Sequence, residues 1–116
     1  MNQARADRVA QMMKQELGAM IQTEVKDPRV GFVSITHVDV SRDLSVARVF
    51  VSIMGNPEQI QDSLKGLKSA SSFLRGEVAR RLGLRHAPQL DFKQDASIVE
   101  SLHIQELMKT LPVRHE

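Results

Sequence analysis

Near the start of the chain, apolar side chains recur three or four positions apart, which is the spacing of one helix face. The residues at this spacing are Val9, Met13, Leu17, Met20 and Ile21. They predict an amphipathic helix from about Arg5 to Val25, with its methionines in the core. The segment Lys26-Asp27-Pro28-Arg29 ends it, because the residue before a proline is disfavoured in the helical conformation.

Two stretches rich in β-branched residues follow, Phe32–Val40 and Leu44–Ile53, and both are predicted to be strands. Within the second stretch the apolar residues alternate with others, which indicates a sheet with one buried and one solvated face. The connection Ser41-Arg42-Asp43 between them is short, so we expect an antiparallel hairpin.

A long helical pattern begins at Asn56-Pro57, where asparagine suits the N-cap and proline the first helical position. Its apolar positions continue to Leu82, and Gly83 is typical of a helix C-terminus. Periodicity alone therefore predicts one helix, Pro57–Leu82. The run Ser69-Ala70-Ser71-Ser72 in its middle favours a break, because serine side chains compete for backbone hydrogen bonds.

The rest of the chain predicts one more strand and one more helix. Gln89–Lys93 alternates between apolar and polar residues, and the long helical connection before it suits a parallel crossover. Ser97-Ile98-Val99-Glu100 has the spacing of a capping box and predicts a helix to about Leu111. The expected fold is α+β, in the order α-β-β-α-α-β-α, with helices packed on one face of a three-stranded sheet.

Composition narrows the class of protein. The chain has 116 residues, enough for one domain, and its 41% hydrophobic and 26% charged residues are typical of a globular fold. It has no cysteine, which excludes a disulfide scaffold and thiolate chemistry and suits a reducing compartment. No apolar run approaches the roughly 18 residues of a membrane span, and no secretory signal is evident. We therefore expect a cytoplasmic domain.

Positive charge is concentrated in one segment. The formal net charge is +2, but residues 65–86 hold six lysines and arginines against one acid, Glu77. Such a segment suits a surface that faces a polyanion, although a solvated helix face shows the same pattern. On a helical wheel Arg75, Arg80 and Arg81 do not form one stripe, so charge alone leaves both interpretations open.

Catalytic and metal-binding motifs are not evident in the sequence. The four histidines lack metal-ligand spacing, and there is neither a P-loop nor a nucleophile elbow. His37, Asp39 and Asp43 form one conceivable acid–base cluster. If Val38 and Val40 pack inward, however, His37 and Asp39 simply face solvent. We predict no enzyme, no cofactor and no metal site.

The composition also limits how the chain can bind nucleic acid. It has four phenylalanines and no tyrosine or tryptophan, which argues against base-stacking platforms. The remaining way for this chain to bind nucleic acid is contact with phosphates through lysine, arginine and helix N-termini.

Several segments carry a recognisable pattern when they are taken together. They are Lys26–Gly31, Val38–Val49, Ser69–Arg75, Leu84–Leu90 and Asp95–Ser97. The Asp-Pro-Arg segment and the Val-Ser-Arg-Asp-Leu hairpin are specific only as a pair. From about residue 5 to residue 110, the chain resembles the bacterial ribosome-binding factor A family.

The resemblance implies a single KH-like ribosome-binding domain over residues 1–116. Its core spans about 5–94, and an extra C-terminal helix spans about 97–111. In the family, two helices meet at a kink that carries an Ala-x-Gly signature. Ala70-Ser71-Ser72 falls on this signature with Ser72 in place of the glycine, so the kink is expected to be shallower or to use Ser72 as an N-cap.

The resemblance also implies a function by binding and not by catalysis. Such a factor associates with the free or precursor small ribosomal subunit and assists late maturation and processing of its ribosomal RNA. It blocks premature subunit joining, and an assembly GTPase takes part in its release. We expect a monomer without a cofactor. The candidate RNA contacts are Lys65, Lys68, Ala70, Ser71, Ser72, Arg75, Arg80, Arg81 and Arg85.

Two other functions stay open at this stage. The chain could be a protein-interaction module that uses the exposed sheet face or the last helix, without RNA contact. It could also be a small enzyme that uses His37, Asp39 and Asp43. RNA binding weakens steeply with salt, so salt dependence separates it from the first alternative. A turnover that His37→Ala abolishes would identify the second.

Overall fold

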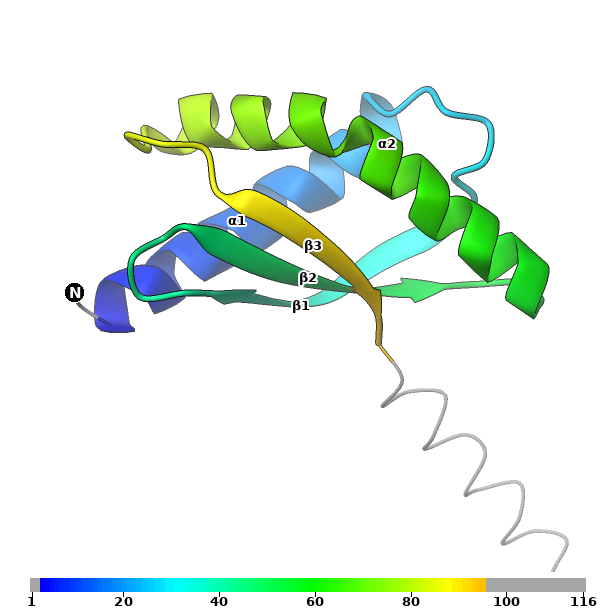
Figure 1. The fold of residues 1–116 in the computed structure, drawn as a ribbon, viewed down its shortest axis with the longest axis horizontal. Coiled ribbons are helices and arrows are strands. Elements are labelled where there is room, and N and C mark those ends of the chain that lie inside the picture. Colours follow the sequence, from blue (N-terminus) through cyan, green and yellow to red (C-terminus); the bar gives the residue numbers. More distant parts are fainter. Residues whose placement is uncertain (1–2, 96–116) are drawn as a thin grey trace, which may run out of the picture.

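The computed structural model describes residues 3–95, which form two helices and a three-stranded sheet (Figure 1). The helices are α1 (Gln3–Thr23) and α2 (Pro57–Leu82), and the strands are β1 (Val33–Val40), β2 (Val46–Ile53) and β3 (Gln89–Gln94). This is the α+β architecture that the sequence predicts. The helix expected at 97–111 lies outside the described residues.

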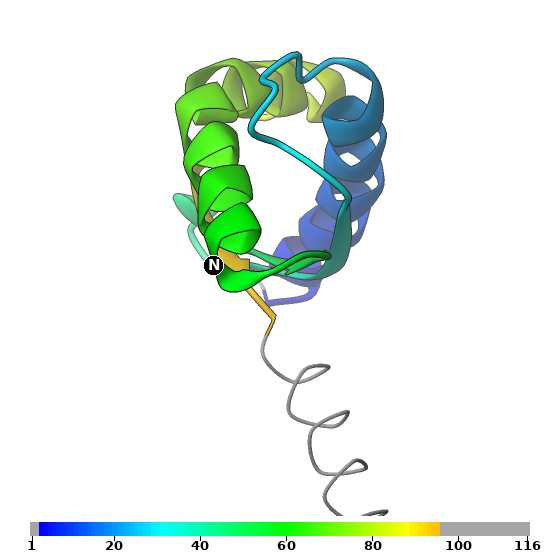
Figure 2. The same ribbon diagram turned by 90° about the vertical axis from the view of Figure 1, so that its right-hand side faces the viewer.

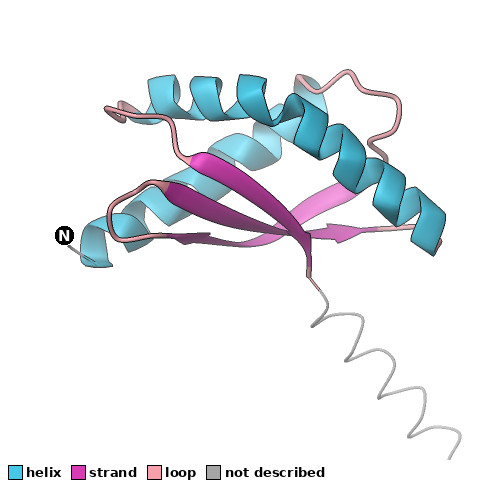
Figure 3. Ribbon diagram, in the orientation of Figure 1, coloured by secondary structure: helices cyan, strands magenta, loops and turns pink. Residues whose placement is uncertain are grey.

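The sheet has β2 at its centre, with β1 antiparallel on one side and β3 parallel on the other. The predicted hairpin and the predicted parallel crossover are therefore both present. Both helices lie on the same face of the sheet (Figure 3). β3 is an edge strand of this sheet, and α2 runs beside it.

The turn between β1 and β2 corrects one predicted boundary. Leu44 has a φ of 63°, in the left-handed region, so β2 begins at Val46 and not at Leu44. The Asp43 carboxylate stabilises this turn, because its Oδ1 accepts hydrogen bonds from the Ser45 hydroxyl, from the Ser41 hydroxyl and from the backbone N–H of Ser45. Those bonds stabilise the charged form and lower the pKa of Asp43.

β1 contains a β-bulge that sequence alternation does not reveal. The pairing with β2 shifts between Ile35 and His37, so Thr36 is an extra residue in β1. In a regular strand, residues an odd number of positions apart face opposite sides of the sheet. Because of the bulge, Val33 and Val38 are nevertheless both buried on the same side. The bulge lets both ends of β1 present valine to the same core.

The apolar faces of α1, α2 and the sheet meet in one core. Every residue named for the buried face of α1 is buried, as predicted. The largest fully buried side chains are Met13, Leu17, Met20, Leu67, Leu74, Val49, Val51, Val78 and Pro88. Neither helix within residues 3–95 is both long enough and apolar enough to cross a membrane.

α2 begins and ends where its sequence predicts. The Asn56 side chain accepts a hydrogen bond from the Gln59 N–H, and the Gln59 side chain accepts one from the Asn56 N–H, each at 2.8 Å. This reciprocal pair is a capping box. Gly83 closes the helix in the left-handed conformation, with a φ of 67°. That conformation is the reason for glycine at this position.

The expected break at residues 69–72 does not interrupt α2, which is one continuous helix of 26 residues. Its axis nevertheless changes direction near the middle (Figure 2). The Ser71 hydroxyl donates to the carbonyl of Lys68 at 2.7 Å, and serine bonds of this kind bend helices. Ser72 lies within the helix without a positive φ, so the bend needs no glycine and Ser72 is not an N-cap.

The loop between α1 and β1 packs directly on the first half of α2. The buried Ser63 hydroxyl donates to the Arg29 carbonyl at 3.2 Å and accepts from the Gly31 N–H at 3.1 Å. One turn further along α2, a Cβ at Gly66 would lie 2.6 Å from a methyl carbon of Val30. Glycine at position 66 therefore allows the loop to approach α2 this closely.

Gly66 and Gly76 offer a matched test of this packing, because both lie inside α2. We expect Gly76→Ala to stabilise the protein by about 0.5–1 kcal/mol through helix propensity, since nothing lies within 4 Å of its added Cβ. Gly66→Ala gains the same propensity, but overpacking against Val30 costs about 1–3 kcal/mol. Urea unfolding of both variants gives the two free energies of unfolding. Equal stability of the two variants would contradict the close loop contact.

Candidate nucleic-acid interface

A groove of about 400 Å³ separates the first half of α2 from β3. Its lining residues are Gln61, Leu64, Lys65, Lys68, Gln89, Leu90, Asp91 and Phe92. Lys65 and Lys68 are both exposed, and neither has an ion pair or a hydrogen-bonded side-chain partner within residues 3–95. The groove therefore presents along one wall two lysines that are unpaired within these residues, while Asp91 in its lining is paired with Lys93 at 3.8 Å.

The other wall of the groove is the edge of the sheet, which is open in the sense that β3 has no second neighbouring strand within residues 3–95. The N–H groups of Gln89 and Asp95 donate to carbonyls of the β2 side, at 2.8 and 2.7 Å. Because successive residues of a strand alternate in direction, the backbone groups of Leu90 and Phe92 face the open edge. This wall offers backbone donors and acceptors beside the partly buried ring of Phe92.

Several predicted contacts share one side of α2. Lys65, Lys68, Ser72 and Arg75 are spaced by three, four and three residues, which places them on one helix face. Ser72 is exposed, whereas Ser71 is partly buried and uses its hydroxyl on the helix backbone. Ala70 packs partly against the core. The structure thus brings Lys65, Lys68 and Ser72 together beside the groove.

Arg75 is engaged with the protein itself. Its Nε donates to the Pro88 carbonyl at 3.2 Å, and its Nη2 donates to the Ala87 carbonyl at 3.0 Å. These bonds hold the segment that leads into β3 against α2. Arg75 therefore positions the start of β3, which forms one wall of the groove. Two of its N–H donors are used for this structural role.

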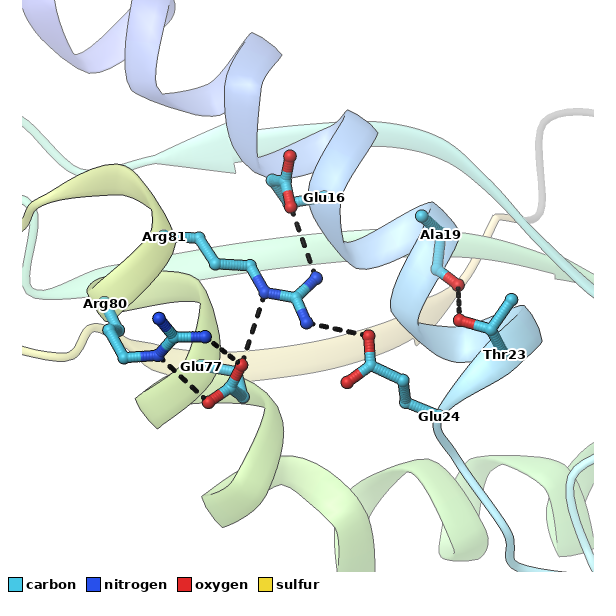
Figure 4. A network of polar contacts seen from close by, with 7 residues as sticks. All are labelled: Glu16, Ala19, Thr23, Glu24, Glu77, Arg80 and Arg81. Carbon is cyan, nitrogen blue, oxygen red and sulfur yellow. Dashed lines mark hydrogen bonds and ion pairs between the residues drawn. The ribbon is translucent and has the colours of Figure 1, made fainter.

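Arg80 and Arg81 take part in an acidic network that joins the two helices (Figure 4). Arg81 reaches Glu16 of α1 at 3.3 Å, Glu24 just after α1 at 2.8 Å, and Glu77 of its own helix at 3.3 Å. Among the described residues Arg80 pairs with Glu77 alone, at 2.9 Å, and its side chain is 69% exposed. The Arg80 guanidinium, with a smaller contribution from Arg81, lowers the pKa of Glu77. Arg81 therefore serves as a link between the helices.

Arg85, the last predicted contact, does not line the groove. It is exposed in the segment that follows α2 and lines a different cleft together with Arg5. The nine candidates are thus spread over several parts of α2 and its C-terminal loop. A helical wheel that included Lys65 and Lys68, and not only the arginines, would have identified the face shared by Lys65, Lys68 and Ser72.

Sequence reasoning assigned no contact to Arg29, which lies beside the serine run. Its guanidinium makes two hydrogen bonds to the Asp27 carboxylate, at 3.0 and 2.6 Å, and one to the Ser69 hydroxyl at 3.0 Å. The bonds from Arg29 lower the pKa of Asp27 to about 2. Arg29 belongs to the Asp-Pro-Arg segment, which is evident in the sequence. Residue spacing alone, however, does not show that its side chain reaches Ser69 on α2.

The conceivable acid–base cluster does not assemble. Val38 and Val40 are buried, as supposed, and His37 and Asp39 are about two thirds exposed, with 3.9 Å between His37 Nε2 and Asp39 Oδ1. Asp43 is bonded within its own turn. Within the part of the chain that the structure describes, no group of three or more histidine and acidic side chains is placed to hold a metal ion.

Comparison with known proteins agrees with this arrangement. The family model for ribosome-binding factor A matches residues 5–108. The chain belongs to the ribosome-binding factor A family. A family member from Desulfitobacterium hafniense is 45% identical over 112 residues, which are 97% of this chain and 90% of that protein. One from Natranaerobius thermophilus is 46% identical over 111 residues, covering 96% and 85% of the two chains.

Solved structures of ribosome-binding factor A share the fold. The crystal structure from Thermus thermophilus superposes with a TM-score of 0.67 at 29% identity, over 77% of this chain and 94% of that one. A homology model of the Thermus thermophilus factor, fitted into a cryo-EM map of its complex with the 30S subunit, has a TM-score of 0.62 at 30% identity. It covers 75% of this chain and 91% of that one.

The Asp27–Arg29 pair predicts a shifted titration. We expect the Asp27 carboxyl carbon to titrate near pH 2 by NMR, and Arg29→Gln to move the midpoint toward 3.8. Because the folded pKa is lowered, the stabilisation is complete above about pH 4 and is lost as pH falls toward 2. Arg42→Gln is the control, since Arg42 bonds to Gln3 instead. An unchanged midpoint in Arg29→Gln would show that Arg29 is not what lowers the pKa of Asp27.

The network in Figure 4 predicts unequal roles for its two arginines. Arg81→Gln removes the ion pairs from α2 to Glu16 on α1 and to Glu24 just after it, whereas Arg80→Gln removes only an exposed pair within α2. We expect Arg81→Gln to lower the urea midpoint and Arg80→Gln to leave it almost unchanged. The difference should shrink at high salt, because salt screens exposed pairs. Equal midpoints at low salt would remove Arg81 as a link between the helices.

Proposed function

We propose that this chain binds the small ribosomal subunit by contacting its ribosomal RNA, and that the groove between α2 and β3 is the main contact. The observation that carries the proposal is the pair of lysines, unpaired within residues 3–95, on a groove whose other wall is an open strand edge. Membership of the ribosome-binding factor A family supports it, as does the complex of the Thermus thermophilus relative with the 30S subunit.

Each wall of the groove suits a different part of an RNA strand. Lys65 and Lys68 supply positive charge for phosphates, and the exposed Ser72 hydroxyl adds a donor on the same face. The edge of β3 offers backbone groups to base edges, and Phe92 gives apolar contact. Such a groove favours unpaired nucleotides, whose bases are free to turn toward β3.

The finer function follows from this binding mode. The chain acts as a maturation factor, which stabilises one RNA conformation in the precursor small subunit while processing of the ribosomal RNA is completed. It is a single-domain monomer that works in the cytoplasm without a catalytic step. Its presence blocks premature joining of the large subunit, and an assembly GTPase takes part in its release.

Three purified proteins test the groove: the wild type, Lys65→Gln/Lys68→Gln, and a control, Lys14→Gln/Lys26→Gln. The control removes the same charge from exposed lysines outside the groove. Cosedimentation with precursor small subunits over a salt series gives the slope of log affinity against log salt. We expect the groove variant to reduce the slope by about 1.4–1.8, since each lost phosphate contact contributes about 0.7–0.9. The control should match the wild type.

The same measurement separates the alternatives. A groove variant with the slope of the control would place the RNA contact elsewhere on the chain. Binding of the wild type without salt dependence would favour a protein-interaction module that contacts ribosomal proteins. No binding to any ribosomal particle at low salt would overturn the proposal as a whole.

A further inference from the structure

A second cleft, of about 580 Å³, lies at the end of α2. Its walls come from three segments far apart in sequence: the first turns of α1, the turn between β1 and β2, and the loop after α2. In Figure 1 the turn and the loop lie at the same end of the molecule. Arg5 comes from α1, Asp43 from the turn, and Arg85 and His86 from the loop. The fold therefore gathers basic side chains that periodicity along the sequence does not connect.

The two arginines of this cleft differ from those of α2. Arg75, Arg80 and Arg81 all bond to groups of the protein. Arg5 and Arg85 are exposed, and neither has an ion pair or a side-chain hydrogen bond within residues 3–95. Their guanidinium groups, each with five donors in a planar fork, thus remain available to an anion.

The acid in the cleft is already engaged. Asp43 Oδ1 accepts hydrogen bonds from the hydroxyls of Ser41 and Ser45, at 2.8 and 2.7 Å, as well as from a backbone N–H. It holds the turn and makes no ion pair with Arg5 or Arg85 in the described part of the chain. The two positive charges of Arg5 and Arg85 therefore exceed the one negative charge of Asp43, and the cleft keeps a net positive charge.

The loop after α2 adds backbone donors. Gly83 and Leu84 direct their N–H groups back to carbonyls of the last helical turn, at Arg80 and Ala79. The N–H groups of Arg85 and His86 have no backbone acceptor within residues 3–95. Unused N–H groups beside arginine side chains are a combination that suits an oxyanion.

We propose that this cleft binds a phosphate of the RNA backbone, as a second contact separate from the groove. The inference rests on the proposed RNA-binding function and extends it to Arg5 and His86, which no sequence argument singled out. Arg5 and Arg85 bind the phosphate oxygens through their guanidinium groups, and the loop N–H groups and the His86 ring add hydrogen bonds.

The spacing of the two contacts has a consequence for the bound RNA. From Lys68 in the groove to Gly83 at the cleft, α2 extends at most about 22 Å, at 1.5 Å per residue. An RNA strand that reaches both contacts must therefore run along α2 for several nucleotides. Two contacts at that separation fix the direction of a strand across the protein, which one groove alone does not.

The first test measures salt dependence on small subunits with Arg5→Gln/Arg85→Gln. Lys14→Gln/Lys26→Gln again serves as the charge-matched control, since neither lysine lines the cleft. We expect the cleft variant to lower the slope of log affinity against log salt by about 0.7–0.9, the value for one lost phosphate contact, and Arg5→Lys/Arg85→Lys to restore most of it. A cleft variant that behaves like the control overturns the cleft, while a loss in Lys65→Gln/Lys68→Gln still supports the groove.

The second test needs no ribosome and therefore separates this inference from the proposed function. Inorganic phosphate is titrated into the ¹⁵N-labelled full chain, against chloride at equal ionic strength. We expect saturating shifts of the backbone amides from Gly83 to His86 in the wild type, and at least tenfold weaker binding in Arg5→Gln/Arg85→Gln. Shifts no larger than those with chloride overturn the cleft as an anion site. Phosphate binding without an effect on the salt slope overturns its role in RNA contact.

Discussion

The contact between the α1–β1 loop and the first half of α2 determines where the groove lies. Ser63, Gly66 and Ser69 follow each other at intervals of three residues, and each meets the loop in a different way. Ser63 satisfies two backbone groups, Gly66 allows close approach, and Ser69 binds the Arg29 side chain. Because the groove lies on another side of the same helical turns, the loop sets the position of Lys65 and Lys68 without touching them.

The two halves of α2 are held by different partners. The loop holds the first half, whereas the core residues Leu74 and Val78 and the ion pairs of Arg81 hold the second half against α1 and the sheet. The bend lies between these attachments (Figure 2). The bend, at the hydrogen bond from Ser71 to Lys68, thus separates two segments of α2 that pack against different partners.

Apart from the break expected inside α2, the sequence was sufficient for the order and type of the described elements, because amphipathic spacing, the Asn56 cap and Gly83 are local signals. It was insufficient for the bulge at Thr36, which depends on pairing with β2, and for the continuity of α2, where serine propensity opposed tertiary packing. The candidate site shows the same division. Lys65 and Lys68 follow from charge, but the roles of Arg75 and Arg81 depend on acceptors more than ten residues away.

The open edge of β3 also affects how copies of this protein behave toward one another. An unpaired strand edge can be extended by a strand of a second molecule, and long apolar edges aggregate for this reason. β3 is only six residues long, and Asp91 and Lys93 place opposite charges 3.8 Å apart on it. These features make a continuous intermolecular sheet unfavourable. The same edge can therefore stay available to a ligand without inviting a strand of a second copy.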